Sequence, residues 1–189
     1  MTSQPQRVWY VAYGSNVNEQ RFLRYLLGDS DHVGARDATP PRRSLWTTAP
    51  LQLRFAGESQ RWGGGVCFVD PDPLATAYVR AWDITAQQFE DVFAQENRRA
   101  IGEPFHWPTV MHSATTIGTS WYAQILPVQL PSIADDQPAL TFTWTTRFPL
   151  NAPAPAYRDT ITSGLADHPD LSPVHIADYL NASIEAEHP

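Results

Sequence analysis

The chain of 189 residues contains no lysine, so all 13 of its basic residues are arginines. It therefore cannot form a Schiff base through a lysine amine, and it cannot hold phosphates with the lysine of a phosphate-binding loop. The formal net charge is −7, which gives no sign of an extended basic surface for nucleic acid. We expect neither a nucleic-acid partner nor lysine chemistry.

Cysteine and long apolar runs are also scarce. The single cysteine, Cys67, cannot form a disulfide within the chain, and no apolar run approaches the roughly 20 residues of a membrane-spanning helix. Residues 1–7 are polar and lack a secretory pattern. We expect a cytoplasmic protein with no membrane partner, folded as a single domain over residues 1–189.

The stretch Val8–Asn16 predicts a buried strand that ends in a tight turn of small residues, Gly14-Ser15-Asn16. A helical pattern follows, with Asn18 as its expected N-cap and Gly28 as its expected end. Such a turn directs backbone N–H groups at one point, which suits a carboxylate, a phosphate or a developing oxyanion. The alternative interpretation is a simple connecting turn.

Alternating apolar residues predict further strands, at residues 44–55, 66–69, 76–82, 120–128 and 139–148, with a bend or an edge at Pro50. Small apolar residues at 77, 79 and 81 share one strand face, which suits the interior of a small barrel. Helices are expected from Pro155 and over residues 174–184. The fold class is therefore predicted as α+β, a small closed mixed β-barrel of about six strands with peripheral helices.

A helix is expected to start after Thr85, with Gln88 as the partner in a capping box. Glu96 lies on the same helical stripe as Phe89 and Phe93, where the pattern favours an apolar residue. Burial of a carboxylate there disfavours its charged form and raises its pKa, as a general acid/base at neutral pH requires.

The alternative is that Glu96 has no catalytic role: the helix frays at this point and the carboxylate pairs with Arg98 or Arg99. Two other acidic residues of this helix, Glu90 and Asp91, lie off the apolar stripe and are expected to face solvent.

Three segments together resemble the γ-glutamylcyclotransferase-like family. Tyr13-Gly14-Ser15-Asn16 is similar to the family loop that ends the first strand, and Phe93–Asn97 resembles the family segment in which a glutamate closes a helix. Pro153–Tyr157 is similar to the late segment that opens a helix. The resemblance covers roughly residues 8–96 and 139–184.

The resemblance implies an enzyme that releases 5-oxoproline from a small γ-glutamyl substrate. In this family the α-amine of the substrate attacks its own γ-carbonyl, so no metal, nucleotide or other cofactor is needed. The leaving amine stays open among glutathione, a γ-glutamyl amino acid and a γ-glutamyl amine. The resemblance makes Glu96 the catalytic acid/base and gives as substrate-binding residues Tyr13, Gly14, Ser15, Asn16 and Tyr157.

The chain departs from the family pattern after this glutamate. Asn97 stands where glycine is common, and Phe105–Pro108 stands where a tyrosine-bearing strand is usual. Since asparagine tolerates left-handed backbone angles, we expect the turn to persist and residues 98–119 to border the pocket. These departures favour the alternative function, a non-catalytic small-ligand or peptide-binding protein on the same fold. A third alternative is γ-glutamyl transfer or deprotection of a larger substrate by the same residues.

Other kinds of site have less support. Ser15 lacks the second glycine of a nucleophile elbow. His106 and His112 have no third ligand at a useful spacing, so no metal site is expected. Cys67 lies in a short apolar run and is expected to be a core thiol. The sequence does not indicate an oligomeric state.

Overall fold

The computed structural model describes residues 4–130, 133 and 136–185. The polar start at residues 1–3 and the end of the expected domain at residues 186–189 lie outside the described residues. The single domain over the whole chain therefore stays a prediction.

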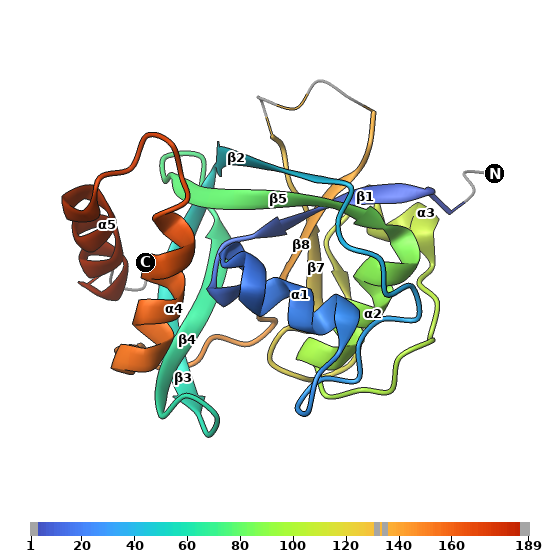
Figure 1. The fold of residues 1–189 in the computed structure, drawn as a ribbon, viewed down its shortest axis with the longest axis horizontal. Helices are drawn as coiled ribbons and strands as arrows, with labels where there is room; N and C mark the ends of the chain where they lie inside the picture. The colour runs from blue at the N-terminus through green and yellow to red at the C-terminus, as the bar shows by residue number, and fades with distance from the viewer. Residues whose placement is uncertain (1–3, 131–132, 134–135, 186–189) are drawn as a thin grey trace.

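Six strands form one mixed sheet in the order β2-β5-β1-β8-β7-β6, and two more form a separate hairpin (Figure 1). In the sheet, β1 and β8 run parallel and the other neighbours run antiparallel. The sheet strands are β1 (Arg7–Ala12), β2 (Arg43–Ala49), β5 (Ala77–Thr85), β6 (Thr115–Thr116), β7 (Gln124–Pro127) and β8 (Ala139–Thr143). The hairpin pairs β3 (Leu51–Ser59) with β4 (Gly64–Pro71).

The predicted closed barrel is wrong, because the six-stranded sheet has open edges at β2 and β6. Pro50 stands between β2 and β3. Because proline has no N–H to donate to a strand ladder, the chain leaves the sheet at this residue and bends into the hairpin. At the other edge, β6 has only two residues and does not return to β2. The α+β class, the mixed six-stranded sheet and the bend at Pro50 are confirmed.

The helices form two groups in space. In Figure 1, α1 and α2 lie together against the strands β1 and β5, and α4 and α5 lie at the other end beside the hairpin. The helices are a 3-10 turn η1 (Ser15–Val17), α1 (Glu19–Leu27), α2 (Ala86–Glu96), α3 (Trp107–Val110), α4 (Pro155–Leu165) and α5 (Pro173–Glu185). The expected helix ends are confirmed: Asn18 caps α1, Gly28 ends it at φ 78°, and Thr85 and Gln88 form the capping box of α2.

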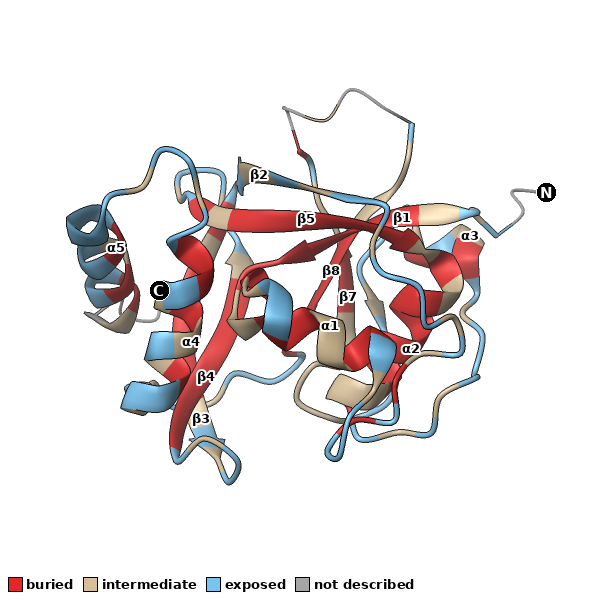
Figure 2. Ribbon diagram, viewed as in Figure 1, coloured by how far each residue is buried: buried red, intermediate tan, exposed pale blue. Residues whose placement is uncertain are grey.

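The core surrounds β1, and Figure 2 shows β1, β4 and β5 as mostly buried. The Tyr10 ring stacks on Phe142 of β8 with ring centres 5.2 Å apart. It also contacts Phe22 of α1 at 5.4 Å and Phe89 of α2 at 5.9 Å. Strands β1 and β8 and helices α1 and α2 therefore meet at the Tyr10 side chain. This packing fixes the end of β1 in place.

Glu90 and Asp91 were predicted to face solvent, and this is wrong: they are 3% and 0% exposed. Asp91 accepts hydrogen bonds from the backbone and guanidinium of Arg36, and Glu90 accepts one from the indole N–H of Trp107 at 2.8 Å. The periodicity indicated one buried face of α2. The chain after α1 and the chain before α3 cover a second face, and their donors compensate the buried charges.

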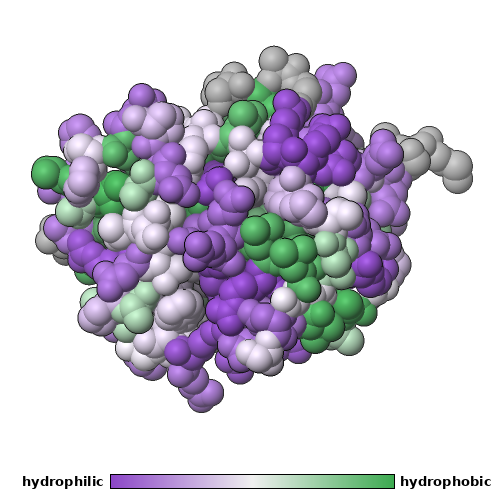
Figure 3. Space-filling view, in the orientation of Figure 1, coloured by the Kyte–Doolittle hydropathy of each residue, from purple (hydrophilic) through white to green (hydrophobic). Residues whose placement is uncertain are grey.

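The surface turned to the viewer in Figure 3 is mixed, with apolar groups in several clusters between hydrophilic ones. Among the residues the structure describes, no helix is both long and apolar enough to cross a membrane. The cytoplasmic location stays a prediction.

Candidate active site

A cavity of about 740 Å³ lies where the end of β1, the end of α2, the β3–β4 hairpin and residues 120–122 meet. The structure brings all six predicted site residues to this cavity, although they come from the beginning, middle and end of the chain. These residues are Tyr13, Gly14, Ser15, Asn16, Glu96 and Tyr157. Their roles stay predictions, but their common location is a property of the fold.

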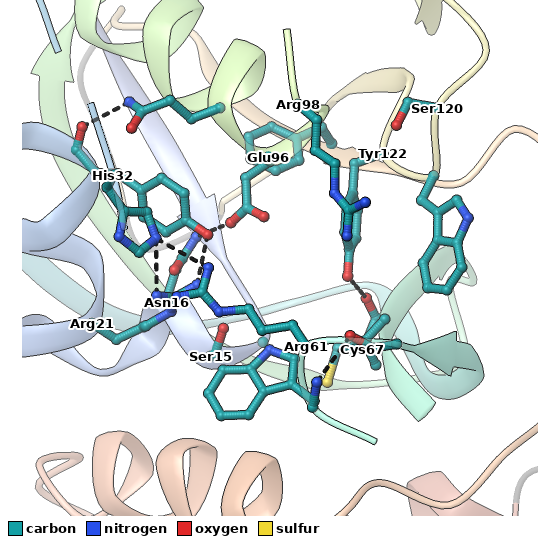
Figure 4. A pocket seen from close by; sticks show the side chains of 18 of the residues that line it. Ser15, Asn16, Arg21, His32, Arg61, Cys67, Glu96, Arg98, Ser120 and Tyr122 are labelled. Atoms are coloured by element: carbon teal, nitrogen blue, oxygen red, sulfur yellow. Dashed lines mark hydrogen bonds between the residues drawn. The ribbon is translucent and has the colours of Figure 1, made fainter. Parts of the chain in front are cut away.

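Glu96 is the last residue of α2, and its carboxylate accepts a hydrogen bond from the Asn16 side-chain amide at 2.8 Å (Figure 4). The same amide donates to the Tyr10 hydroxyl at 3.1 Å. The buried Oδ1 of Asn16 has no hydrogen-bond partner among the described residues. A site with an anion and an unused buried acceptor is suited to a ligand that carries N–H donors.

The fraying alternative for Glu96 is wrong, since α2 continues to this residue. Arg99 pairs instead with Glu103, and within the described parts of the chain Glu96 forms no ion pair. The expectation of deep burial is also wrong, because Glu96 is only half-buried. The final turn of α2 faces the cavity, so the apolar stripe ends one turn earlier, at Phe93.

The turn after β1 is closed by hydrogen bonds from Val17 N–H to Gly14 O at 3.0 Å and from Asn18 N–H to Ser15 O at 3.1 Å. The backbone N–H groups of Ser15 and Asn16 donate to no described residue, as expected at the start of a helical turn. A Cβ at Gly14 would stand 3.1 Å from the Cys67 Cβ, so close packing of the turn on β4 favours glycine.

Tyr13 and Tyr157 are buried, and each uses its hydroxyl within the protein. The Tyr13 hydroxyl donates to the carbonyl of Phe142 at 2.8 Å, and the Tyr157 hydroxyl accepts from the N–H of Cys67 at 3.2 Å. Burial raises the pKa of both hydroxyls well above the usual value near 10, so both stay protonated at neutral pH. Their rings line the cavity while their hydroxyls fix the loop and β4. Cys67 itself is buried, as predicted.

Asn97 keeps the turn after Glu96 by hydrogen bonds and not by a left-handed backbone, which corrects the prediction. Its φ is −94°, and the left-handed residue is Arg98 with φ 53°. The Asn97 amide donates to the carbonyls of Phe93 at 2.9 Å and Tyr122 at 3.1 Å. The end of α2 is thereby tied to Tyr122 on the opposite wall of the cavity.

The prediction that residues 98–119 border the pocket is right for only part of the segment. Arg98 and Arg99 line the large cavity, whereas Phe105 and His106 line a separate cavity of about 230 Å³. Trp121 and Tyr122, immediately before β7, add two further aromatic rings to the main cavity.

Several solved structures share this arrangement of strands and helices. A structure of a gamma-glutamyl cyclotransferase matches 94% of this chain and 88% of its own, with a TM-score of 0.61 and 16% identity. The chain has the γ-glutamyl cyclotransferase fold. An uncharacterized protein from Homo sapiens matches over the same shares at a TM-score of 0.59 and 17% identity. YkqA from Bacillus subtilis matches 96% of this chain and 55% of its own, with a TM-score of 0.57 and 14% identity.

Sequence comparison adds one relative outside these structures. Histone deacetylase 5 of Arabidopsis thaliana is 30% identical over 205 aligned residues, which cover 94% of this chain and 31% of that protein. The chain therefore spans less than a third of that relative. No protein-family model matches the chain.

Within the γ-glutamyl cyclotransferase fold, the cavity contains polar side chains that the motifs did not predict. In Figure 4, Arg21 and His32 lie on one side of Glu96, and Arg98 and Tyr122 lie on the other. The position of Arg21 could have been inferred, because it shares a helix face with Tyr25 four residues later. His32, Arg61 and Tyr122 come from irregular segments whose course the sequence does not specify. In the described residues, no group of three or more His, Cys, Asp or Glu side chains is placed to hold a metal ion.

Proposed function

We propose that the chain is a cyclotransferase that releases 5-oxoproline from a γ-glutamyl compound. The observation that carries this proposal is the hydrogen bond of 2.8 Å between Glu96 and Asn16 inside a cavity of about 740 Å³. It joins two of the three motifs on which the resemblance depends. The γ-glutamyl cyclotransferase fold supports the same activity at low identity.

In the proposed reaction the Glu96 carboxylate accepts a proton from the substrate α-ammonium. The freed amine attacks the γ-carbonyl carbon, which forms the C–N bond of a five-membered lactam. The proton held by Glu96 then passes to the leaving nitrogen, and the original amide bond breaks. The attacking nitrogen loses its second proton to the same carboxylate, which passes it to the departing amine, so the products are the neutral lactam and an ammonium ion. Because the nucleophile belongs to the substrate, the protein needs to orient the substrate, move two protons from the attacking nitrogen to the leaving nitrogen and stabilise charge on the carbonyl oxygen.

The loop after β1 is suited to that last task. The backbone N–H groups of Ser15 and Asn16 lie next to each other, line the cavity and donate to no described residue. In this proposal they donate to the γ-carbonyl oxygen as negative charge develops on it. The rings of Tyr13 and Tyr157 form the wall behind the loop.

The leaving amine is not assigned. The cavity is large enough for more than the γ-glutamyl group, since about 740 Å³ falls within the range of pockets that bind drug-sized ligands. Glutathione, a γ-glutamyl amino acid and a γ-glutamyl amine are all substrates to test.

The test is to incubate the protein with these three substrate types and to measure 5-oxoproline. We expect release from at least one of them. Glu96→Gln should lower kcat by roughly 100-fold to 10,000-fold, the usual contribution of a general acid/base. The glutamine can still accept the hydrogen bond from Asn16, so folding should be unaffected.

Glu58→Gln is the matched control. Glu58 also lines the cavity, is exposed, and accepts a hydrogen bond from Asn151 that glutamine can retain. Its activity should stay within about twofold of the parent protein. If no substrate releases 5-oxoproline although the protein binds γ-glutamyl compounds, the alternative of a non-catalytic binding protein replaces this proposal.

A further inference from the structure

Arg21 is a buried cation without a carboxylate partner. It is 7% exposed, it lines the cavity, and among residues 4–130, 133 and 136–185 no acidic group pairs with its guanidinium. Two of the nearby acids are engaged elsewhere: Asp29 with Arg24 and His32, and Asp31 with Arg24 and Arg61. A buried charge without a counter-ion is costly, so its retention points to an anion that binds there.

The guanidinium of Arg21 is held in a fixed orientation. Nη1 donates to Nε2 of His32 at 3.1 Å, and Nη2 donates to the Tyr25 hydroxyl at 2.8 Å. Because an arginine can only donate, His32 must be neutral with its proton on Nδ1, and that proton goes to Asp29 at 2.9 Å. The Arg21 guanidinium also lies over the rings of Tyr25 and Trp62, at 5.0 Å and 5.7 Å from their centres.

The third nitrogen of the group is unused. Nε of Arg21 is buried and has no hydrogen-bond partner in the part of the chain that the structure describes. Nε and a neighbouring Nη are the two donors with which arginine binds a carboxylate in a bidentate manner. If Arg21 served only to hold Tyr25 and His32 in place, the unsatisfied Nε–H group would have no explanation.

We propose that Arg21 binds the α-carboxylate of the γ-glutamyl group. The inference rests on the proposed function, in which the α-ammonium of the substrate faces Glu96. The α-carbon of such a substrate carries one positive and one negative group. The cavity offers an anion at Glu96 and a buried cation at Arg21, and among the described residues the two do not pair with each other. Both charges influence the Tyr25 hydroxyl: burial and the Glu96 charge raise its pKa, and the Arg21 charge lowers it.

In this proposal Glu96 binds the α-ammonium group of the substrate and Arg21 binds its α-carboxylate. The substrate class becomes narrower: the γ-glutamyl group must keep its α-carboxylate free, whatever its leaving amine. A γ-aminobutyryl amide has the same nucleophile and carbonyl but lacks this carboxylate, and it should be a poor substrate.

The test uses two lactams, 5-oxoproline and 2-pyrrolidinone, which share a ring and differ by the carboxylate. Calorimetric titration should show that the parent protein binds 5-oxoproline about 10-fold to 100-fold more tightly, the usual effect of a charge-assisted hydrogen bond. In Arg21→Gln the two affinities should differ by less than about twofold. Arg98→Gln is the matched control, because Arg98 lines the same cavity but is exposed to solvent; this variant should keep the parent ratio.

A second measurement does not depend on how well Arg21→Gln folds. In the parent protein, the Nε–H resonance of Arg21, assigned through its loss in Arg21→Lys, should shift on addition of 5-oxoproline and stay in place with 2-pyrrolidinone. Equal binding of the two lactams by the parent protein, or an unchanged ratio in Arg21→Gln, would overturn the assignment. Carboxylate-dependent binding without 5-oxoproline release from any substrate would leave Arg21 as an anion site and reject the cyclotransferase. Failure of the parent protein to bind 5-oxoproline would reject both.

Discussion

One side chain of the loop, Asn16, connects the two halves of the candidate site: its amide lies 2.8 Å from the Glu96 carboxylate and 3.1 Å from the Tyr10 hydroxyl. Tyr10 in turn packs against α1, α2 and β8. The Glu96 carboxylate is thereby linked to the core through the Asn16 amide.

Asn16→Asp should move the acidic limit of the pH–rate profile to higher pH. It replaces the amide donor with a second carboxylate next to Glu96, and two carboxylates that share a site do not both stay charged, so one keeps its proton to higher pH. The measurement is kcat/KM against pH for the parent and the variant, with Ser15→Ala as a neighbouring change that adds no charge. A profile in Asn16→Asp that coincides with the parent profile would contradict the proposed role of Glu96.

His32 should titrate below its usual value near 6.5. Burial lowers the pKa of this imidazole most strongly and the Arg21 charge lowers it further, while Asp29 acts in the opposite direction. Because the unfolded chain then binds the proton more readily, stability should fall as the pH drops through 6.5 toward the folded value. An NMR titration of the His32 ring should give a lower midpoint still in Asp29→Asn, and a parent midpoint above 6.5 would contradict the prediction.

Gly164→Ala should destabilise the protein although alanine is the better helix former. A Cβ at this position in α4 would stand 2.6 Å from the backbone nitrogen of Asn18 and 2.8 Å from its Cα, and neither atom can rotate away. Overpacking of this kind costs about 1–3 kcal/mol, more than the roughly 1 kcal/mol gained in helix propensity. Urea unfolding measures the difference, and the exposed neighbour Ser163→Ala should change stability by less than about 0.5 kcal/mol.

Asp83→Asn should cost about 3 kcal/mol of unfolding free energy. The buried carboxylate pairs with Arg7 at 2.6 Å, Arg42 at 2.5 Å and Arg43 at 3.2 Å, so asparagine removes charge-assisted hydrogen bonds and leaves three partly exposed guanidiniums close together without their shared anion. Burial raises the Asp83 pKa, but the three guanidiniums outweigh it and lower the value, so this contribution should be lost as the pH falls below about 3.8. The exposed Asp178→Asn serves as the control, and equal denaturation midpoints for the two variants would refute the expectation.

Local chemistry made much of the fold predictable. The caps at Asn18 and Thr85, the end at Gly28 and the bend at Pro50 each depend on interactions within a few residues, and each is found as expected. Closure of the sheet depends on which strands meet at the edges. That is a long-range property, and a strand pattern alone does not carry it.

The candidate site also has a part that could be predicted from local sequence and a part that could not. The loop and Glu96 could be identified because motifs mark them, and the fold then brings them together. The burial of Glu90 and Asp91 could not be predicted, because their partners lie in irregular segments more than ten residues away. Arg21 was missed because a charged residue early in a helix ordinarily indicates a solvated face.

The parallel pairing of β8 with β1 has a consequence for biosynthesis. The loop at Tyr13 is held by the carbonyl of Phe142, which lies 129 residues later, so the loop takes its final shape only after β8 has been made. A shorter nascent chain contains the signature loop but lacks the strand that shapes it. Ligand binding should therefore arise only after β8 has been made and has docked beside β1.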